Sequence, residues 1–402
     1  MRYNALHVVL LSHEYPPFIY GGVGTFVENL AHGLLRRGVE VTVIAGYPVP
    51  SGGFKKFKDD KEQTDSGINV IRFPYPNISP RQLWFQIFNL PKLSEVIRRI
   101  DADVVHGQSG VAYPALIKLK DLASTVVSYH NNPKMELTLG LYSMTRGGSL
   151  SDIYKYVVGY PVEMHRFKKE FELSDAPIAV SESLMNDLLL DMGTRNGKKM
   201  RYIHNGVNIE ELEKEYASVD SEKEKDKPVI FFAGRLYWRK GVLNLVQLAY
   251  LLEKKYHLNY KIVVHGSGPL RGKMETLIQK HGLTNIALKG FTARDEFLKG
   301  MKRASYVVIP STFEACPMIL LESMCLGKIP VMFDLPYSEE LTQQGEYGIL
   351  AHNVEEMAAK IKSFPTQIDA ETYEDKIRQF AITQYHISKT AAQYHDLYKS
   401  IC

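Results

Sequence analysis

Short apolar runs alternate with amphipathic helical patterns along the first half of the chain. The apolar runs rich in β-branched residues predict strands at Leu6–Leu11, Val39–Ile44, Val104–His106, Thr125–Tyr129 and Pro177–Val180. Helical patterns such as Thr25–Arg37 and Ser183–Asp191 lie between them. Strands that alternate with helices in this way predict a parallel sheet with helices on both faces.

The same alternation starts again after a charged stretch, Asp220–Lys227, which ends at Pro228. The strands predicted beyond it are Val229–Ala233, Tyr260–His265, Asn285–Leu288, Tyr306–Pro310 and Ile329–Phe333. A length of 402 residues also favours two domains. We therefore predict two α/β domains, residues 1–205 and 206–385. A long helical pattern over Glu371–Ser400 predicts a C-terminal helix, and residues 386–402 could pack back on the first domain.

The composition is that of an ordinary globular protein, with 45% hydrophobic and 23% charged residues. No apolar run reaches the roughly 18 residues that a membrane span needs, and the apolar run near the N-terminus predicts a buried strand and not a signal peptide. The three cysteines have neither disulfide-framework nor zinc spacing, which favours a cytoplasmic location. The net charge of +4 shows no basic stripe, so we expect no nucleic-acid partner.

One segment leaves a membrane contact open. Arg81–Leu93 carries Trp84, Phe85 and other apolar residues beside basic ones, so it could lie on the inner membrane face as a peripheral segment. Packing in a core or an acceptor pocket is the favoured interpretation.

Two carboxylates stand eight positions apart, Glu314 and Glu322, around the end of a predicted strand. Pro317 suits the first position of a short helix, which would carry Met318, Ile319 and Glu322. Ligands bind at the carboxyl ends of strands in open α/β sheets. Surface carboxylates are the alternative, but the apolar helix favours partial burial, and a buried carboxylate usually has a partner.

Cations and glycines follow other predicted strands. Arg235 and Lys240 come after Val229–Ala233, where a guanidinium and an ammonium suit a diphosphate, although two solvated loop cations are equally consistent. Gly266 lies in a Gly-Ser-Gly-Pro turn after Tyr260–His265 and on its own indicates only a turn.

Near the N-terminus, Gly22 and Gly24 open the helix predicted at Thr25–Arg37, where free N–H groups attract anions. A dinucleotide fingerprint would need a third small residue where Val27 stands, which disfavours hydride chemistry. His130 and His106 both end predicted strands, and each is a candidate hydrogen-bonding group. A structural histidine is the favoured interpretation for either one alone.

Taken together, these motifs resemble the retaining, nucleotide-sugar-dependent glycosyltransferases of family 4, which have the GT-B fold. The matching segments are YPPFIYGGVGTFVENLAHGLLRRGVEVTVIAG, HNGVN, FFAGRLYWRKG and the Glu-x7-Glu pair, and the resemblance covers nearly the whole chain. It implies two Rossmann-like domains whose parallel sheets face each other across a cleft. The family usually has aspartate where this chain has Asn208, and often glycine where it has Pro317.

The resemblance also implies roles for individual residues. Arg235 and Lys240 would hold the donor diphosphate, Glu322 would bind the ribose hydroxyls, and Glu314 would contact the transferred sugar. The glycines at 22 and 24 would approach the phosphate and the acceptor, and His130 would contact the donor sugar and stabilise the developing positive charge. The Gly266 turn and the start of the helix at Pro317, Met318 and Ile319 would complete the donor site.

We therefore expect a hexosyltransferase that retains anomeric configuration and needs neither metal nor cofactor. Its partners would be a nucleotide sugar and an acceptor, either a glucan or disaccharide or a cell-surface or lipid-linked glycan. A sugar-nucleotide epimerase, a phosphorylase and a non-catalytic nucleotide-sugar-binding module are the alternatives.

Overall fold

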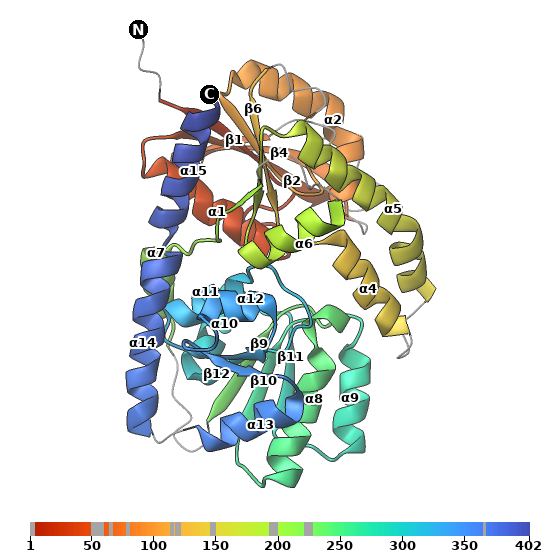
Figure 1. Cartoon of the computed structure of the whole chain (residues 1–402), viewed down its shortest axis with the longest axis vertical. Coiled ribbons are helices and arrows are strands. Elements are labelled where there is room, and N and C mark those ends of the chain that lie inside the picture. Colours follow the sequence, from red (N-terminus) through yellow and green to blue (C-terminus); the bar gives the residue numbers. More distant parts are fainter. Residues whose placement is uncertain are drawn as a thin grey trace. The chain divides into compact units, whose positions relative to one another are not determined.

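The computed structural model describes residues 5–49, 60–63, 67–77, 81–112, 116, 122–144, 150–192, 200–220, 228–364 and 367–402. The chain forms two compact units, each built on its own sheet (Figure 1). Unit 1 contains Met1–Leu137, Ser149–Asn208 and Tyr385–Cys402, and unit 2 contains Thr138–Gly148 and Ile209–Gln384. The predicted class, two parallel-sheet α/β domains, is confirmed.

The described sheet of unit 1 has the strand order β3-β4-β2-β1-β5-β6-β7-β8. The strands are β1 (His7–Leu11), β2 (Glu40–Val49), β3 (Asp60–Gln63), β4 (Asn69–Pro76), β5 (Val104–Gln108), β6 (Ser124–Tyr129), β7 (Ala176–Ala179) and β8 (Arg201–Tyr202). All pairings are parallel except that of β3 with β4. In the centre, Val9 of β1 lies opposite Thr42 of β2 and Val105 of β5. A central strand is buried on both faces, which is why its sequence is continuously apolar.

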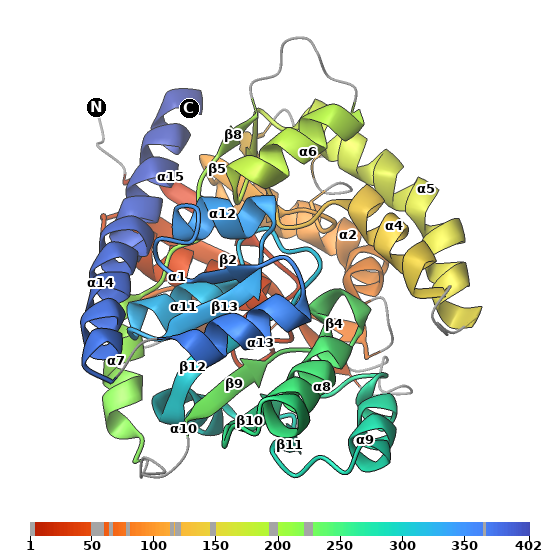
Figure 2. The same cartoon turned by 60° about the horizontal axis from the view of Figure 1, so that its bottom comes forward.

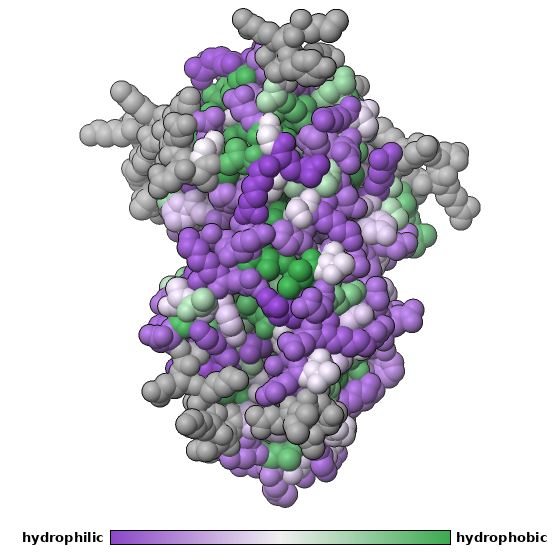
Figure 3. Space-filling model, turned by 90° about the vertical axis from the view of Figure 1, so that its left-hand side faces the viewer, coloured by the Kyte–Doolittle hydropathy of each residue, from purple (hydrophilic) through white to green (hydrophobic). Residues whose placement is uncertain are grey.

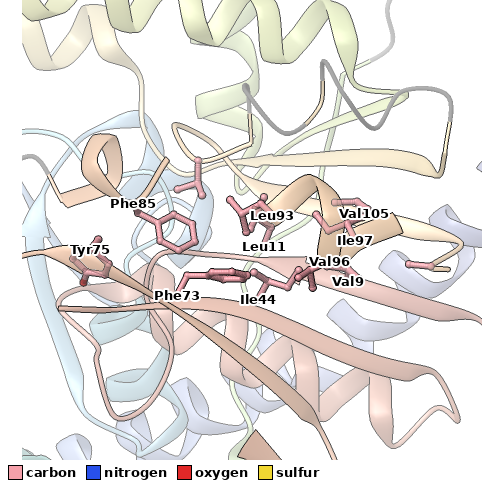
Figure 4. Close-up of a cluster of buried hydrophobic side chains, with 12 residues drawn as sticks. Val9, Leu11, Ile44, Phe73, Tyr75, Phe85, Leu93, Val96, Ile97 and Val105 are labelled. Carbon is pink, nitrogen blue, oxygen red and sulfur yellow. The ribbon is translucent and has the colours of Figure 1, made fainter. Parts of the chain in front are cut away.

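Helices α1 (Gly22–Leu35), α2 (Arg81–Ile100), α4 (Pro133–Met144), α5 (Leu150–Leu173) and α6 (Glu182–Met192) join these strands. One core cluster of unit 1 lies between α2 and the sheet (Figure 4). Phe85 of α2 packs there with Phe73 of β4 and Leu11 of β1, all fully buried. This packing joins α2 to strands β1, β2, β4 and β5 of the sheet.

The segment considered for membrane contact lies at the start of α2. Phe85 and Leu93 are buried in the core cluster, and Trp84 packs against it. The side chains of Ile87, Phe88 and Leu90 lie outside the described residues. None of the described helices is both long and apolar enough to cross a bilayer. On the face drawn in Figure 3, hydrophilic side chains predominate and divide the apolar ones into separate patches.

The described residues of unit 2 form a six-stranded parallel sheet in the order β11-β10-β9-β12-β13-β14. The strands are β9 (Val229–Ala233), β10 (Lys261–His265), β11 (Ile286–Gly290), β12 (Ala304–Ile309), β13 (Ile329–Phe333) and β14 (Ile349–Ala351). The helices are α7 (Ile209–Ser218), α8 (Val242–Tyr250), which continues as a π-helix over Leu251–Lys255, α9 (Arg271–Lys280), α10 (Arg294–Arg303), α11 (Met318–Cys325), α12 (Pro336–Thr342), α13 (Val354–Ser363) and α14 (Gln367–Tyr385). Helix α8 packs with α9 and α13, and α10 packs with α7 (Figure 2).

The predicted single helix over Glu371–Ser400 is wrong, because the chain forms α14 and then α15 (Ile387–Ile401). His386 between them has an extended backbone, and its Nδ1 accepts the N–H of Ser388 at 3.0 Å. The same residue pairs with Val207, whose N–H donates to Tyr385 and whose carbonyl accepts from Ile387. Helix α15 then lies beside α1 in unit 1 (Figures 1 and 2).

Candidate functional site

The loop after β9 carries the two predicted cations. Arg235 is exposed, and its guanidinium lies 5.0 Å from the centre of the Tyr237 ring. Lys240 ends a short 3₁₀-helix, and Gly241 follows with φ +61°. A Cβ at Gly241 would lie 1.7 Å from the carbonyl oxygen of Pro310, so only glycine lets this loop pack against the end of β12. The close approach brings Lys240 to the loop that holds Glu314.

Glu314 lies on that loop, after β12, and its carboxylate pairs with the ammonium of Lys240. Its side chain is only 7% exposed. Burial alone would raise the pKa of Glu314, but the positive charges of Lys240 and Arg239 outweigh burial and hold the pKa below its usual range. Glu314 is therefore ionised at neutral pH, and the structure brings these two predicted residues into direct contact.

The predicted Gly266 turn packs against the same loop. Gly266 has φ +142°, and a Cβ there would lie 1.8 Å from the carbonyl oxygen of Gly234. Gly234 donates its N–H to His265 at 3.0 Å, and Leu236 donates to Ser267 at 2.8 Å. Gly266 is thus required for two strand-end loops to stack, whatever else it contacts.

The start of α11 differs slightly from the prediction. Pro317 has an extended backbone and precedes the helix, so that Met318 and not Pro317 is its first residue. The carbonyl of Pro317 accepts the N–H of Leu320 at 3.0 Å. The N–H groups of Met318 and Ile319 belong to the first turn, where no intrahelical acceptor exists, so both can donate to a ligand.

Glu322 lies in α11 with a side chain that is only 7% exposed. Its Oε1 is 2.9 Å from Nη1 of Arg294, the first residue of α10. Arg294 also pairs with Glu215 of α7 at 3.0 Å. Burial would lower the pKa of Arg294, but the two carboxylates outweigh it and raise the pKa. The Glu-x7-Glu pair is therefore two separate ion pairs, one with Lys240 and one with Arg294.

Arg294 was not predicted from the sequence, because no motif marks a single arginine in a charged helix. One signal was present. A cation in the first turn of a helix faces the positive end of the helix dipole, which is unfavourable unless another group compensates. Arg294 stands in that turn, followed by Asp295 and Glu296, which suit it.

In unit 1, His130 follows β6 and is half-buried. Its Nε2 lies 2.7 Å from Oε1 of Gln108, and its ring centre lies 5.0 Å from that of Phe26. Burial lowers the pKa of His130 to about 4, although the carboxylate of Glu14 acts in the opposite direction. The imidazole is therefore neutral at neutral pH, so it can donate or accept a hydrogen bond but carries no charge.

Gly22 and Gly24 lie in the first turn of α1, which begins three residues before the predicted Thr25. Glu14, which was also not predicted from the sequence, lies beneath this turn and is buried. Its Oε2 accepts the N–H of Tyr20 at 3.2 Å, and its Oε1 lies 3.2 Å from Nε2 of His13. A charged residue three positions after an apolar strand was the signal for Glu14.

His106 has a structural role. It is fully buried, its Nδ1 lies 2.6 Å from the hydroxyl of Tyr398, and its Nε2 lies 2.7 Å from Oγ of Ser128. Ser128 in turn lies 2.8 Å from the hydroxyl of Tyr394. Both ring nitrogens are occupied by groups that join the sheet to α15, so His106 is not available to a ligand.

The predicted residues thus form one group in unit 2 and another in unit 1. The unit 2 group combines the cations Arg235 and Lys240, the buried carboxylates Glu314 and Glu322, and the N–H groups at the start of α11. Together these groups suit a ligand that carries both phosphates and hydroxyls. Within the described residues, no cluster of three or more His, Cys, Asp or Glu side chains is placed to hold a metal ion. The expected independence of metal stays a prediction.

Two family models match successive parts of the chain. A model described as Glycosyltransferase Family 4 matches residues 20–211, and one described as Glycosyl transferases group 1 matches residues 213–379. An uncharacterized glycosyltransferase of Methanocaldococcus jannaschii is 27% identical over 338 residues, which are 80% of this chain and 79% of that protein.

Solved structures share the fold over nearly the whole length. Sucrose-phosphate synthase from Thermosynechococcus elongatus has a TM-score of 0.74 at 18% identity, with 98% of each chain covered. HepE of Anabaena, solved in complex with UDP and glucose, has a TM-score of 0.67 at 17% identity, with 98% of this chain and 100% of that one covered.

Proposed function

Because this chain belongs to the group 1 glycosyltransferases, which use nucleotide sugars, we propose that it transfers a hexose to an acceptor hydroxyl with retention of anomeric configuration and without a metal ion. The acceptor is a sugar or glycan. The observation that carries the proposal is the Lys240–Glu314 pair, where two strand-end loops of unit 2 meet.

The diphosphate leaving group needs positive charge as the anomeric C–O bond breaks. The ammonium of Lys240 is fixed by Glu314, and the guanidinium of Arg235, five residues earlier in the same loop, is exposed. Fixed cations and helix N–H groups stabilise such an anion without having to reorganise. These groups supply the charge that a divalent metal supplies in other transferases, which supports metal independence.

The transferred sugar carries hydroxyl groups and develops positive charge at its anomeric carbon. Glu314 is ionised and has a second oxygen that can accept a sugar hydroxyl while Lys240 holds the first. The neutral imidazole of His130 suits a hydrogen bond to the sugar, because a cation there would oppose the developing charge. The acceptor oxygen would bond the anomeric carbon on the face from which the diphosphate leaves, which gives retention, and the leaving phosphate would take the proton of the acceptor hydroxyl.

The experiment begins with a panel of UDP-, ADP- and GDP-sugars screened for thermal stabilisation. Binders are then tested with glucan, disaccharide and lipid-linked acceptors for acceptor-dependent release of nucleoside diphosphate. NMR of the product gives the anomeric configuration, and turnover in EDTA tests the independence of metal. If the donor is epimerised without an acceptor, the protein is an epimerase and the proposal is wrong. If donors bind without any turnover, the protein is a binding module.

Lys240→Ala should lower kcat by about 100- to 1,000-fold, as loss of one transition-state charge contact typically does. Glu322→Ala should also lower turnover strongly. Lys289→Ala removes an exposed lysine of the same unit and serves as the matched control. Near wild-type transfer by the folded Lys240 and Glu322 variants would refute the assignment of the site.

A further inference from the structure

Arg294 connects three elements of unit 2 through two carboxylates. Its Nη1 lies 2.9 Å from Oε1 of Glu322 in α11. Its Nε and Nη2 both lie 3.0 Å from Oε2 of Glu215 in α7. The guanidinium carbon also lies 5.2 Å from the ring centre of Phe297, one turn further along α10. Contacts in three directions hold the planar guanidinium in one orientation.

The two carboxylates differ in their exposure. The side chain of Glu322 is 7% exposed within an apolar helix, whereas those of Arg294 and Glu215 are 42% and 36% exposed. A buried carboxylate is costly without a partner, and Arg294 is the partner of Glu322 at 2.9 Å. A carboxylate has about four acceptor positions on its two oxygens, and Arg294 contacts Oε1, which leaves Oε2 able to accept from a ligand.

The charge balance decides what this cluster can bind. One guanidinium between two carboxylates leaves a net charge of about −1. Such a cluster repels phosphate and attracts hydroxyl groups that donate hydrogen bonds. Arg294 therefore does not belong with Arg235 and Lys240 as a diphosphate contact.

We propose that Arg294 is a positioning residue that orients the carboxylate of Glu322 toward the ribose hydroxyls of the nucleotide, with Glu215 holding Arg294 in place. The inference rests on the proposed function, since it requires a nucleotide ligand. Arg294 acts through Glu322 and does not touch the reacting atoms.

The test compares ribose with dideoxyribose. Affinities of UDP, ADP and GDP, and of their 2′,3′-dideoxy counterparts, are measured by calorimetry on the wild type and the variants. The wild type should prefer the ribonucleotide by about 10- to 100-fold, the range expected for hydrogen bonds to a charged group. Arg294→Ala should remove most of that preference while the affinity for the dideoxy form stays the same. Arg294→Lys should restore part of it, because an ammonium still pairs with Glu322 but lacks the planar fork.

Glu215→Gln should weaken the ribose preference by a few-fold, since charge-assisted contacts are about twice as strong as neutral ones. In a Glu322→Gln background, Arg294→Ala should have no further effect on the preference. Arg303→Ala is the matched control, because it removes the same side chain nine residues along α10, about 13 Å away along the axis. If Arg294→Ala does not fold, the lysine and Glu215 variants give the same comparison.

The outcomes separate the two proposals. A wild type that binds none of the three nucleotides overturns both the function and this inference. A wild type that binds them with a ribose preference that survives Arg294→Ala overturns the role of Arg294 alone. Equal binding of ribose and dideoxyribose by the wild type also overturns it, while the transferase proposal stands.

Discussion

The two glutamates of the Glu-x7-Glu pair have different surroundings. Glu314 contacts a lysine from the loop after β9, whereas Glu322 contacts an arginine from α10. Read from the sequence alone, two carboxylates in this pattern also suit acid–base work as in glycoside hydrolysis. The pKa of Glu314 is held below its usual range, which removes it as a general acid at neutral pH. Both side chains are better suited to accept hydrogen bonds from hydroxyls.

Glu314→Gln should lower kcat/KM by about 10- to 100-fold, because a neutral amide replaces a charged hydrogen-bond acceptor at the transferred sugar. The amide has the same shape, so the thermal midpoint should change little while kcat/KM falls. Steady-state kinetics with the preferred donor measures the loss, and Glu346→Gln on the exposed surface is the control. Unchanged kcat/KM would remove Glu314 from the site.

The buried His106 predicts a dependence of stability on pH. Burial lowers its pKa to about 3, and the unfolded state has the ordinary value of about 6.5. Below pH 6.5 the unfolded chain therefore binds a proton that the folded chain excludes, so stability falls as the pH falls toward 3. The contribution is about 1.4 kcal/mol per pH unit within that window.

Denaturant unfolding between pH 7 and pH 4 measures this slope. His106→Gln should make this slope shallower by about 1.4 kcal/mol per pH unit, and the exposed His257→Gln should leave it unchanged. An unchanged slope in the His106 variant would contradict the neutral, buried state.

Among the elements, the strands of unit 2 were the most predictable. The strands β9 and β13 have the predicted bounds, because each is a short apolar run with turn residues on both sides. The strand β4 was not predicted, since Arg72 and two prolines interrupt its apolar pattern. The break at His386 was also not predicted, because the pairing with Val207 that causes it joins residues far apart in sequence.

The same distinction holds for the site. Lys240 and Glu314 could be predicted, because each follows a recognisable strand and belongs to a motif. Arg294 and Glu14 could not be placed, since their roles depend on carboxylate, imidazole and backbone partners that only the folded chain brings near.

The contact of α1 with α15 predicts opposite effects of one substitution at two glycines. A Cβ at Gly33 would lie 2.8 Å from Cγ1 of Ile387 and 2.9 Å from Cβ of Ala391. Gly33→Ala should therefore destabilise by about 1–3 kcal/mol through overpacking, despite the better helix propensity of alanine. At Gly272 of α9 nothing lies within 4 Å of the added Cβ, so Gly272→Ala should stabilise by up to about 1 kcal/mol. Denaturant unfolding of both variants gives the comparison, and equal stabilisation would contradict the close helix contact.

At the scale of the whole molecule, the chain has two compact units, and the predicted donor contacts at Arg235, Lys240 and Glu322 all lie in unit 2. A nucleoside diphosphate at 100 times its Kd should stabilise the protein by about 2.7 kcal/mol. Hydrogen exchange should then slow mainly in the loops after β9 and β12 and at the start of α11. Protection confined to unit 1 would contradict this placement of the donor.

The position of α15 also has a consequence for the order in which the molecule is made. Its residues complete unit 1, yet the ribosome reaches them only after all of unit 2 has been synthesised. Until then, the imidazole of His106 and the hydroxyl of Ser128 lack their partners Tyr398 and Tyr394. Unit 2 consists of Ile209–Gln384 and the short earlier segment Thr138–Gly148. All of it is synthesised before α15, so it can fold first during translation. Unit 1 is therefore the first to emerge from the ribosome and the last to be completed. The part of its sheet that α15 contacts stays without that helix while unit 2 is synthesised.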